Sequence, residues 1–132
     1  MSYPINKVVV IGANGMLGLP VTRALAKAGF DVIAALRKPD DAPATLPAGV
    51  RAVAADVTSE SSLAATFSGA DAVYVSLSMT PAKTRKNFRL ESEGMRAIVS
   101  AARAVGVSRV AYLSSIMQKN SAMDCWVLQM KR

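Results

Sequence analysis

The sequence contains no histidine and a single cysteine, Cys125, among its 132 residues. The lack of histidine excludes catalytic histidine dyads and histidine-ligated metals, so we expect no metal site. One cysteine excludes an internal disulfide bond, which suits a reducing compartment. No apolar run reaches the ~18 residues that a membrane-spanning helix needs. These absences predict a cytoplasmic protein that does not span a membrane.

Aromatic and acidic residues are also scarce. Aromatic side chains make up 5 % of the chain, and 16 Lys and Arg residues outnumber 9 Asp and Glu residues, which gives a net charge of +7. A basic surface attracts phosphate-bearing partners. A nucleic-acid-binding face usually has more clustered cations and more stacking residues. The composition therefore makes nucleic acid a weak candidate, and a phosphorylated small ligand fits at least as well.

The abundant apolar residues, 52 % of the chain, fall into alternating strand and helix patterns. Short apolar runs predict strands at residues 7–12, 31–37, 50–56, 71–78 and 108–115. Helical spacing predicts helices at residues 17–28, 58–69 and 83–105, and the start of another at 125–132. Strands that alternate with helices imply parallel strands and right-handed crossovers. We expect one α/β domain over residues 1–132, a doubly wound parallel sheet of strand order 3-2-1-4-5 with helices on both faces.

The same spacing predicts which side of each helix is buried. In the first helix the predicted apolar face consists of Leu17, Val21, Leu25 and Ala28. In the long helix it consists of Met95, Ile98, Val99, Ala102 and Val105. The basic residues near the start of the long helix are interpreted as a solvated face rather than a phosphate or nucleic-acid contact: Lys83, Arg85, Lys86, Arg89 and Arg96.

A glycine-rich segment, GANGMLG, follows the first strand and opens the first helix. Gly12 would permit the tight turn, Gly15 would let the backbone approach a pyrophosphate, and Gly18 would let the helix pack close to the strand. Phosphates would then bind the free N–H groups at the helix N-terminus. The alternative is an ordinary glycine turn. The residues of this loop that we expect to bind a dinucleotide are Gly12, Asn14, Gly15, Met16, Leu17 and Gly18.

The spacing G-x-x-G-x-x-G resembles that of extended and atypical short-chain dehydrogenase/reductases. Three further segments are similar to consecutive parts of NmrA-like or isoflavone-reductase-like proteins: GANGMLGLPVTRALAKAGFDVIAALRKP, AADVTSESSLAATFSGADAVYVSLS and AIVSAARAVGVSRVAYLSS. The resemblance implies an NAD(P)-binding Rossmann-like domain and an oxidoreductase that transfers hydride between nicotinamide and a small carbonyl or unsaturated substrate. It also implies a C-terminal substrate-binding portion, which we expect to be absent from this chain. The fifth strand would then be an edge, which favours a possible homodimer.

The end of the second strand carries Arg37 and Lys38, where a site that prefers NAD usually has an acidic residue. An arginine at this position can pair with a 2′-phosphate. Asp31 precedes the strand and so belongs to the wrong end of the sheet. We therefore expect NADP(H) to be preferred, with NAD(H) possible. The alternative is that both cations only face solvent.

The resemblance assigns roles to residues after the third and fourth strands. Asp56 and Val57 would hold the adenine edge, and Ser76, Leu77 and Ser78 lie where the family runs past the nicotinamide ribose. The alternatives are a helix-capping carboxylate for Asp56 and a core residue for Val57.

Catalysis in short-chain reductases usually needs a serine and a Tyr-x-x-x-Lys helix. By resemblance, Ser115, next to Ser114, is the candidate serine and Lys131 the candidate lysine, but Val127 stands where the tyrosine would be. The alternatives are strand-end hydroxyls and a solvated lysine. Two functions stay open: an NADPH-dependent oxidoreductase, or its cofactor-binding half, and a non-catalytic NADP(H)-sensing regulator of NmrA type.

Overall fold

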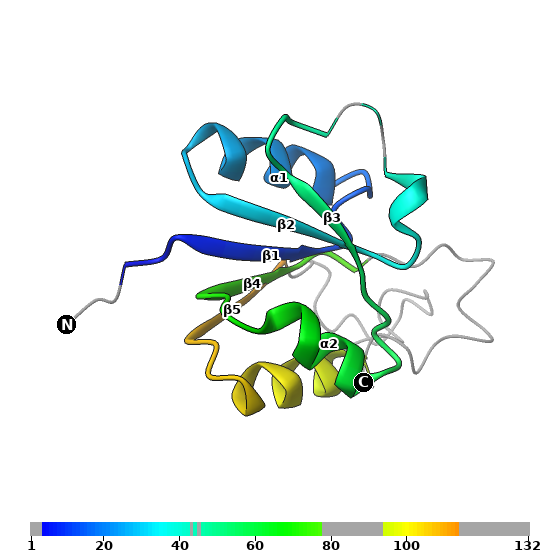
Figure 1. Cartoon of the computed structure of the whole chain (residues 1–132), viewed down its shortest axis with the longest axis vertical. Helices are drawn as coiled ribbons and strands as arrows, with labels where there is room; N and C mark the ends of the chain where they lie inside the picture. Colours follow the sequence, from blue (N-terminus) through cyan, green and yellow to red (C-terminus); the bar gives the residue numbers. More distant parts are fainter. Residues whose placement is uncertain (1–3, 43, 45, 78–93, 114–132) are drawn as a thin grey trace, which may run out of the picture.

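The computed structural model describes residues 4–42, 44, 46–77 and 94–113. Five parallel strands form one sheet in the order β3-β2-β1-β4-β5 (Figure 1). They are β1 (Lys7–Ile11), β2 (Asp31–Leu36), β3 (Arg51–Ala54), β4 (Ala72–Val75) and β5 (Arg109–Tyr112). The predicted fold class and strand order are therefore confirmed.

The first two helices are shorter than predicted. The described helices are α1 (Gly18–Lys27), α2 (Glu60–Phe67) and a helical segment at residues 94–104. A short 3-10 helix, η1 (Pro39–Asp41), lies in the proline-rich stretch between β2 and β3, where Pro39 suits a first helical position. The rest of the predicted long helix and the helix predicted at 125–132 lie outside the described residues. No helix in the described part of the chain is long and apolar enough to cross a membrane.

The sheet separates two layers of helix (Figure 1), with α1 on one face and α2 and residues 94–104 on the other. Alternate side chains of β1 pack against the two helix layers, because successive side chains of a strand point to opposite faces of the sheet. Val9 packs with Leu63, Phe67 and Ile98 on one side. Val10 packs on the other side. The central strands are thus buried on both faces, as their continuous apolar runs predict.

The predicted buried face of α1 was wrong at its ends. The fully buried positions are Gly18 and Thr22, whereas Leu17 is 54 % exposed and Ala28 is also exposed. At Gly18 the helix α1 approaches the end of β1 closely, so this part of its buried face has room only for small side chains. The Thr22 hydroxyl is satisfied inside the helix, since it donates a 2.8 Å hydrogen bond to the carbonyl of Gly18.

The helical segment at 94–104 also corrects the predicted pattern. Ile98 and Ala102 are buried, as expected, and Ala101 joins them in the core. Val99, which we expected to be buried, is 37 % exposed. The buried stripe is centred between Ile98 and Ala102, so Val99 lies at its margin.

Asp71 connects the amino ends of three strands. Its Oδ2 accepts hydrogen bonds from the backbone N–H of Lys7 (2.8 Å), the first residue of β1, and of Asn6 (2.9 Å), the residue before it. Its carbonyl accepts a 2.9 Å hydrogen bond from the Ser108 hydroxyl, which precedes β5. The N–H donors of Lys7 and then Asn6, with a further contribution from the Lys7 charge, hold the pKa of Asp71 below its ordinary value of 3.8.

Replacing Asp71 with asparagine should destabilise the protein in a pH-dependent way. The folded-state pKa is lowered, so the stabilisation is present above the unfolded value near 3.8 and is lost as the pH falls through the folded-state value. In urea unfolding followed by circular dichroism, we expect Asp71→Asn to be less stable than wild type at pH 7. The difference should shrink as the pH is lowered below 3.8.

Asp40→Asn, at an exposed acid in η1, provides the control and should leave stability close to wild type. An Asp71→Asn deficit that is equally large at pH 7 and pH 3 would show that shape, not charge, is the basis of this contact.

Candidate functional site

The predicted site residues follow the carboxyl ends of four neighbouring strands. Ile11 at the end of β1 is level with Ala35 of β2 and Val75 of β4, and Leu36 of β2 is level with Ala54 of β3. Because the strands are parallel, the segments after them meet at one edge of the sheet. That edge carries the residues 12–18, 37–38, 56–57 and 76–77. Ser78, Ser115 and Lys131 lie outside the described residues, so their roles stay predictions.

Two glycines of the loop are required by the fold itself. Gly12 has a φ of +78°, and a Cβ there would lie 2.0 Å from the carbonyl oxygen of Ser76. A Cβ on Gly18 would lie 1.9 Å from the carbonyl oxygen of Gly12. Real Cβ atoms do not come this close to backbone. Gly12 therefore makes the turn beside β4, and Gly18 allows α1 to approach β1, as the sequence predicts.

Gly15 is different, because the fold alone does not demand it. Its φ is not positive, and an added Cβ would meet only the Gly12 oxygen, at 3.2 Å. Its N–H donates to the Gly12 carbonyl (3.0 Å), and its carbonyl accepts from Leu19 (3.0 Å). The outer side of this residue is thus open, as close approach by a ligand would require.

The N-terminus of α1 has no cap from its own sequence. Leu17 occupies the capping position, offers no side-chain acceptor, and no acidic residue follows in the first turn. Within the described part of the chain, no hydrogen bond uses the backbone N–H of Met16 or Leu17. Unpaired donors and the helix dipole make such an end attractive to an anion.

The contrast with α2 is direct. There Ser59 caps the helix, accepting a hydrogen bond from the Ser62 N–H, and Glu60 stands in the first turn. The cap is therefore Ser59 and not the neighbouring Thr58. The positive end of α2 is thus satisfied internally, whereas that of α1 is not.

Asp56 is held in place by a residue that sequence reasoning missed. Its Oδ1 accepts hydrogen bonds from the Thr58 hydroxyl (2.6 Å) and the Thr58 N–H (2.9 Å). These bonds, and more weakly the positive charge of Arg37, lower the pKa of Asp56 and keep it ionised near neutral pH. The carboxylate therefore orders the turn before α2, which is close to the capping role weighed as its alternative. An Asp-x-Thr pattern before a helix was the available signal.

The two ends of β2 carry opposite charges. Arg37 and Lys38 follow the strand and are exposed at the site edge. Asp31 is its first residue, at the far end, where it forms a 4.0 Å ion pair with Arg51. Both side chains of that pair are more than half exposed, so it contributes little to stability. The prediction that Asp31 lies at the wrong end of the sheet is confirmed.

Gly94 is a further residue at this edge that the sequence analysis did not identify. A Cβ there would lie 3.7 Å from the side chain of Val57 and 3.9 Å from that of Leu77. The segment 94–104 thus begins beside two predicted site residues. Gly94 is far in the sequence from Val57, so the sequence does not show that the two lie together. The available signal was a glycine at the start of an apolar helical pattern.

The structure has five parallel strands, a glycine turn after β1 and, after that turn, a helix with an uncapped N-terminus. These features define a Rossmann-like α/β domain. The family model described as NAD(P)H-binding matches residues 12–131, and the chain belongs to this family. The match covers all four strand-end segments of the candidate site.

Solved structures agree on the fold. A nucleoside-diphosphate-sugar epimerase from Staphylococcus aureus is similar with a TM-score of 0.72 and 20 % identity, over 87 % of this chain and 40 % of that one. A variant of uronate dehydrogenase from Agrobacterium tumefaciens, complexed with NAD, has a TM-score of 0.71 and 25 % identity, over 85 % and 42 %. A short-chain dehydrogenase/reductase superfamily protein from Agrobacterium tumefaciens with bound NAD has a TM-score of 0.66 and 27 % identity, over 83 % of this chain and 33 % of that one. In eight of the similar structures, the chain spans 33 to 63 % of the other protein's length.

Alanine substitutions should separate the glycines by their roles in stability. Gly18→Ala forces a Cβ against the Gly12 carbonyl, so we expect a loss of about 3 kcal/mol or more. Gly15→Ala needs only a shift of a few tenths of an ångström and should change stability by about 1 kcal/mol or less. Urea unfolding measures both.

Gly29→Ala provides a backbone control, since Gly29 has a φ of +93° but nothing within 4 Å of an added Cβ. Gly29→Ala therefore tests backbone strain without a steric clash. Its loss of stability should fall between those of Gly15→Ala and Gly18→Ala. Equal costs for Gly15→Ala and Gly18→Ala would contradict the distinction drawn here.

Proposed function

We propose that this protein binds NADP(H) at the glycine loop and is an NADPH-dependent oxidoreductase of the NmrA-like atypical short-chain reductase type, or its cofactor-binding half. The observation that carries the proposal is the uncapped N-terminus of α1 beside Gly15. Two backbone donors there lack partners within the described residues, and the adjacent glycine leaves the backbone open to approach. The membership of the NAD(P)H-binding family supports the same reading.

The residues present fit a pyrophosphate. The N–H groups of Met16 and Leu17 would donate to its oxygens, and the α1 dipole would add ~0.3–1 kcal/mol. The flanking side chains do not block this approach, since Met16 is 89 % exposed. The bound nicotinamide would supply the hydride chemistry.

Arg37 supports a preference for NADP(H). It follows β2 at the site edge and is exposed, so its guanidinium is free to meet a 2′-phosphate. The ionised Asp56 on the neighbouring segment contributes a negative charge close enough for Arg37 to influence its pKa. Arg37 would therefore balance both the carboxylate and the phosphate. Two of the similar structures hold NAD, which makes the preference a matter for direct measurement.

The catalytic step rests on the sequence alone. Ser115 and Lys131 are the proposed catalytic residues, and Val127 occupies the position of the usual tyrosine. The missing phenol favours the second candidate, a non-catalytic NADP(H)-sensing regulator. A homodimer and a cytoplasmic location also stay proposals. One structural neighbour, from Burkholderia pseudomallei, is described as an exported protein, so the location in particular needs a direct test.

Titration of the protein with NADPH and, separately, NADH, followed by nicotinamide fluorescence, tests the dinucleotide proposal. We expect both to bind and NADPH to bind more tightly. Arg37→Ala should weaken NADPH binding about tenfold, because a charge-assisted pair is worth ~1.5–3 kcal/mol, and should hardly change NADH binding. Arg51→Ala removes the same side chain from the opposite end of the sheet and is the matched control.

Gly15→Ala should weaken both dinucleotides about tenfold or more while the protein stays folded, because an added methyl group would hinder the proposed approach of the phosphates to this backbone. Failure of either dinucleotide to bind wild type would refute the proposal. Incubation with NADPH and a panel of quinones and carbonyl compounds then distinguishes the two candidates. Loss of nicotinamide absorbance identifies a reductase, and binding without turnover leaves the regulator.

A further inference from the structure

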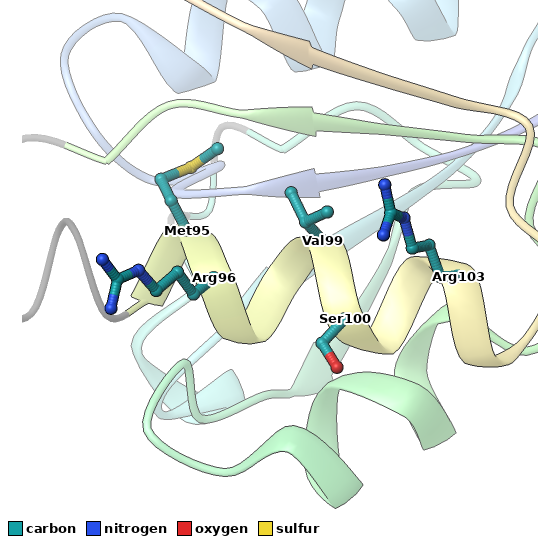
Figure 2. A pocket seen from close by; sticks show the side chains of 5 residues that line it. All are labelled: Met95, Arg96, Val99, Ser100 and Arg103. Atoms are coloured by element: carbon teal, nitrogen blue, oxygen red, sulfur yellow. The ribbon is translucent and has the colours of Figure 1, made fainter.

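A hollow lies along one flank of the helical segment 94–104. Its volume is about 420 Å³, within the ~300–1,000 Å³ typical of small-molecule sites. The described residues that line it all belong to this one helix: Met95, Arg96, Val99, Ser100 and Arg103 (Figure 2). Met95 follows Gly94, which lies beside Val57 and Leu77, so the hollow begins next to the candidate dinucleotide site and extends from there along the helix.

The lining residues form an ordered track. Met95, Val99 and Arg103 are spaced four residues apart and project from the same side of the helix, and Arg96 lies beside Met95 (Figure 2). The two arginines are seven residues apart, which corresponds to about 10 Å along the axis. An apolar strip thus lies between two guanidinium groups.

Both guanidinium groups are exposed and unpaired among the residues that the structure describes. Within the described part of the chain, neither Arg96 nor Arg103 makes a side-chain hydrogen bond or an ion pair. Glu60 of α2 contacts the lining, but its carboxylate accepts a hydrogen bond from the Ser100 hydroxyl. This hydrogen bond leaves the negative charge of Glu60 in place, but within the described residues the carboxylate forms no ion pair with either arginine.

Val99 gives the lining of the hollow an apolar part. Its position in the apolar pattern predicts burial, yet it is 37 % exposed between two cations. Its exposed methyl groups add apolar surface to the hollow, which the apolar part of an amphipathic ligand would cover. Charge and apolar surface together therefore specify the chemistry of the occupant.

We propose that this hollow binds an anionic amphiphile, a small molecule whose phosphate, sulfonate or carboxylate group pairs with Arg103 or Arg96 and whose apolar part covers Val99 and Met95. Pairing of guanidinium with such an anion is charge-assisted and can be bidentate. A second copy of the chain is disfavoured here, because two such helices face to face would bring four arginines together.

Isothermal titration with octyl phosphate tests the proposal, with octanol, octyltrimethylammonium and inorganic phosphate as comparison probes. We expect octyl phosphate to bind at least about tenfold more tightly than each of these, because only it satisfies both halves of the track. The double variant Arg96→Gln/Arg103→Gln should lose about tenfold or more in affinity. Val99→Asn should weaken octyl phosphate but not inorganic phosphate.

The matched control is Lys27→Gln/Arg51→Gln, which removes two positive charges from other elements and should leave binding unchanged. A second readout needs no variant: octyl phosphate should shift the ¹⁵N–¹H resonances of residues 95–103 and not those of 12–18. Because this test uses no dinucleotide, it is independent of the proposed function.

Three outcomes would overturn the proposal. Shifts confined to residues 12–18, or displacement of octyl phosphate by NADPH, would place the anion on the glycine loop. A dimer that Val99→Asp converts to monomer, without octyl phosphate binding, would make this face an interface between copies. Arginine-dependent co-sedimentation with phosphatidylglycerol vesicles, without binding of monomeric octyl phosphate, would assign the arginines to a membrane surface.

Discussion

The carbonyl oxygen of Gly12 occupies the space that a side chain on residue 18 would need, and much of the structure depends on that contact. The contact sets how closely α1 lies against β1, and it selects small buried residues, Gly18 and Thr22, on the adjoining face of the helix. Gly12 in turn fits only because it has no side chain to meet the Ser76 carbonyl. The turn, the helix and the end of β4 are therefore fixed together. The strand-end edge is held in shape by backbone, before any side chain at the site is considered.

The sheet and its strand order followed from the sequence because buried parallel strands have a simple signature. Val8 to Ile11 and Val32 to Leu36 are continuous apolar runs, and each is buried on both faces. The glycine turn could be predicted for a similar reason, since few other chain geometries need three glycines at that spacing. These features are local, so short stretches of sequence specify them.

The features that the sequence did not reveal depend on tertiary distances. Periodicity assigned Leu17 and Val99 to the core, but the lateral position of each helix on the sheet decides which edge of an apolar stripe is covered. Gly94 reaches the site only because a crossover returns residues 94–104 beside Val57. The partner of Asp56 was within two residues, yet the competing roles of such a carboxylate are distinguished only by the hydrogen bonds that Thr58 makes.

The two helix N-termini suggest how this domain would respond to its surroundings. That of α2 is capped by Ser59 and has Glu60 in its first turn, whereas that of α1 has backbone donors without partners in the described part of the chain. A folded state whose donors are satisfied by a dissolved anion is stabilised in proportion to the logarithm of the ligand concentration once that exceeds the dissociation constant. The unfolded chain has no such ligand site. If a nucleotide supplies the anion, the lifetime of the protein against unfolding and proteolysis becomes a measure of nucleotide supply, even where no reaction is catalysed.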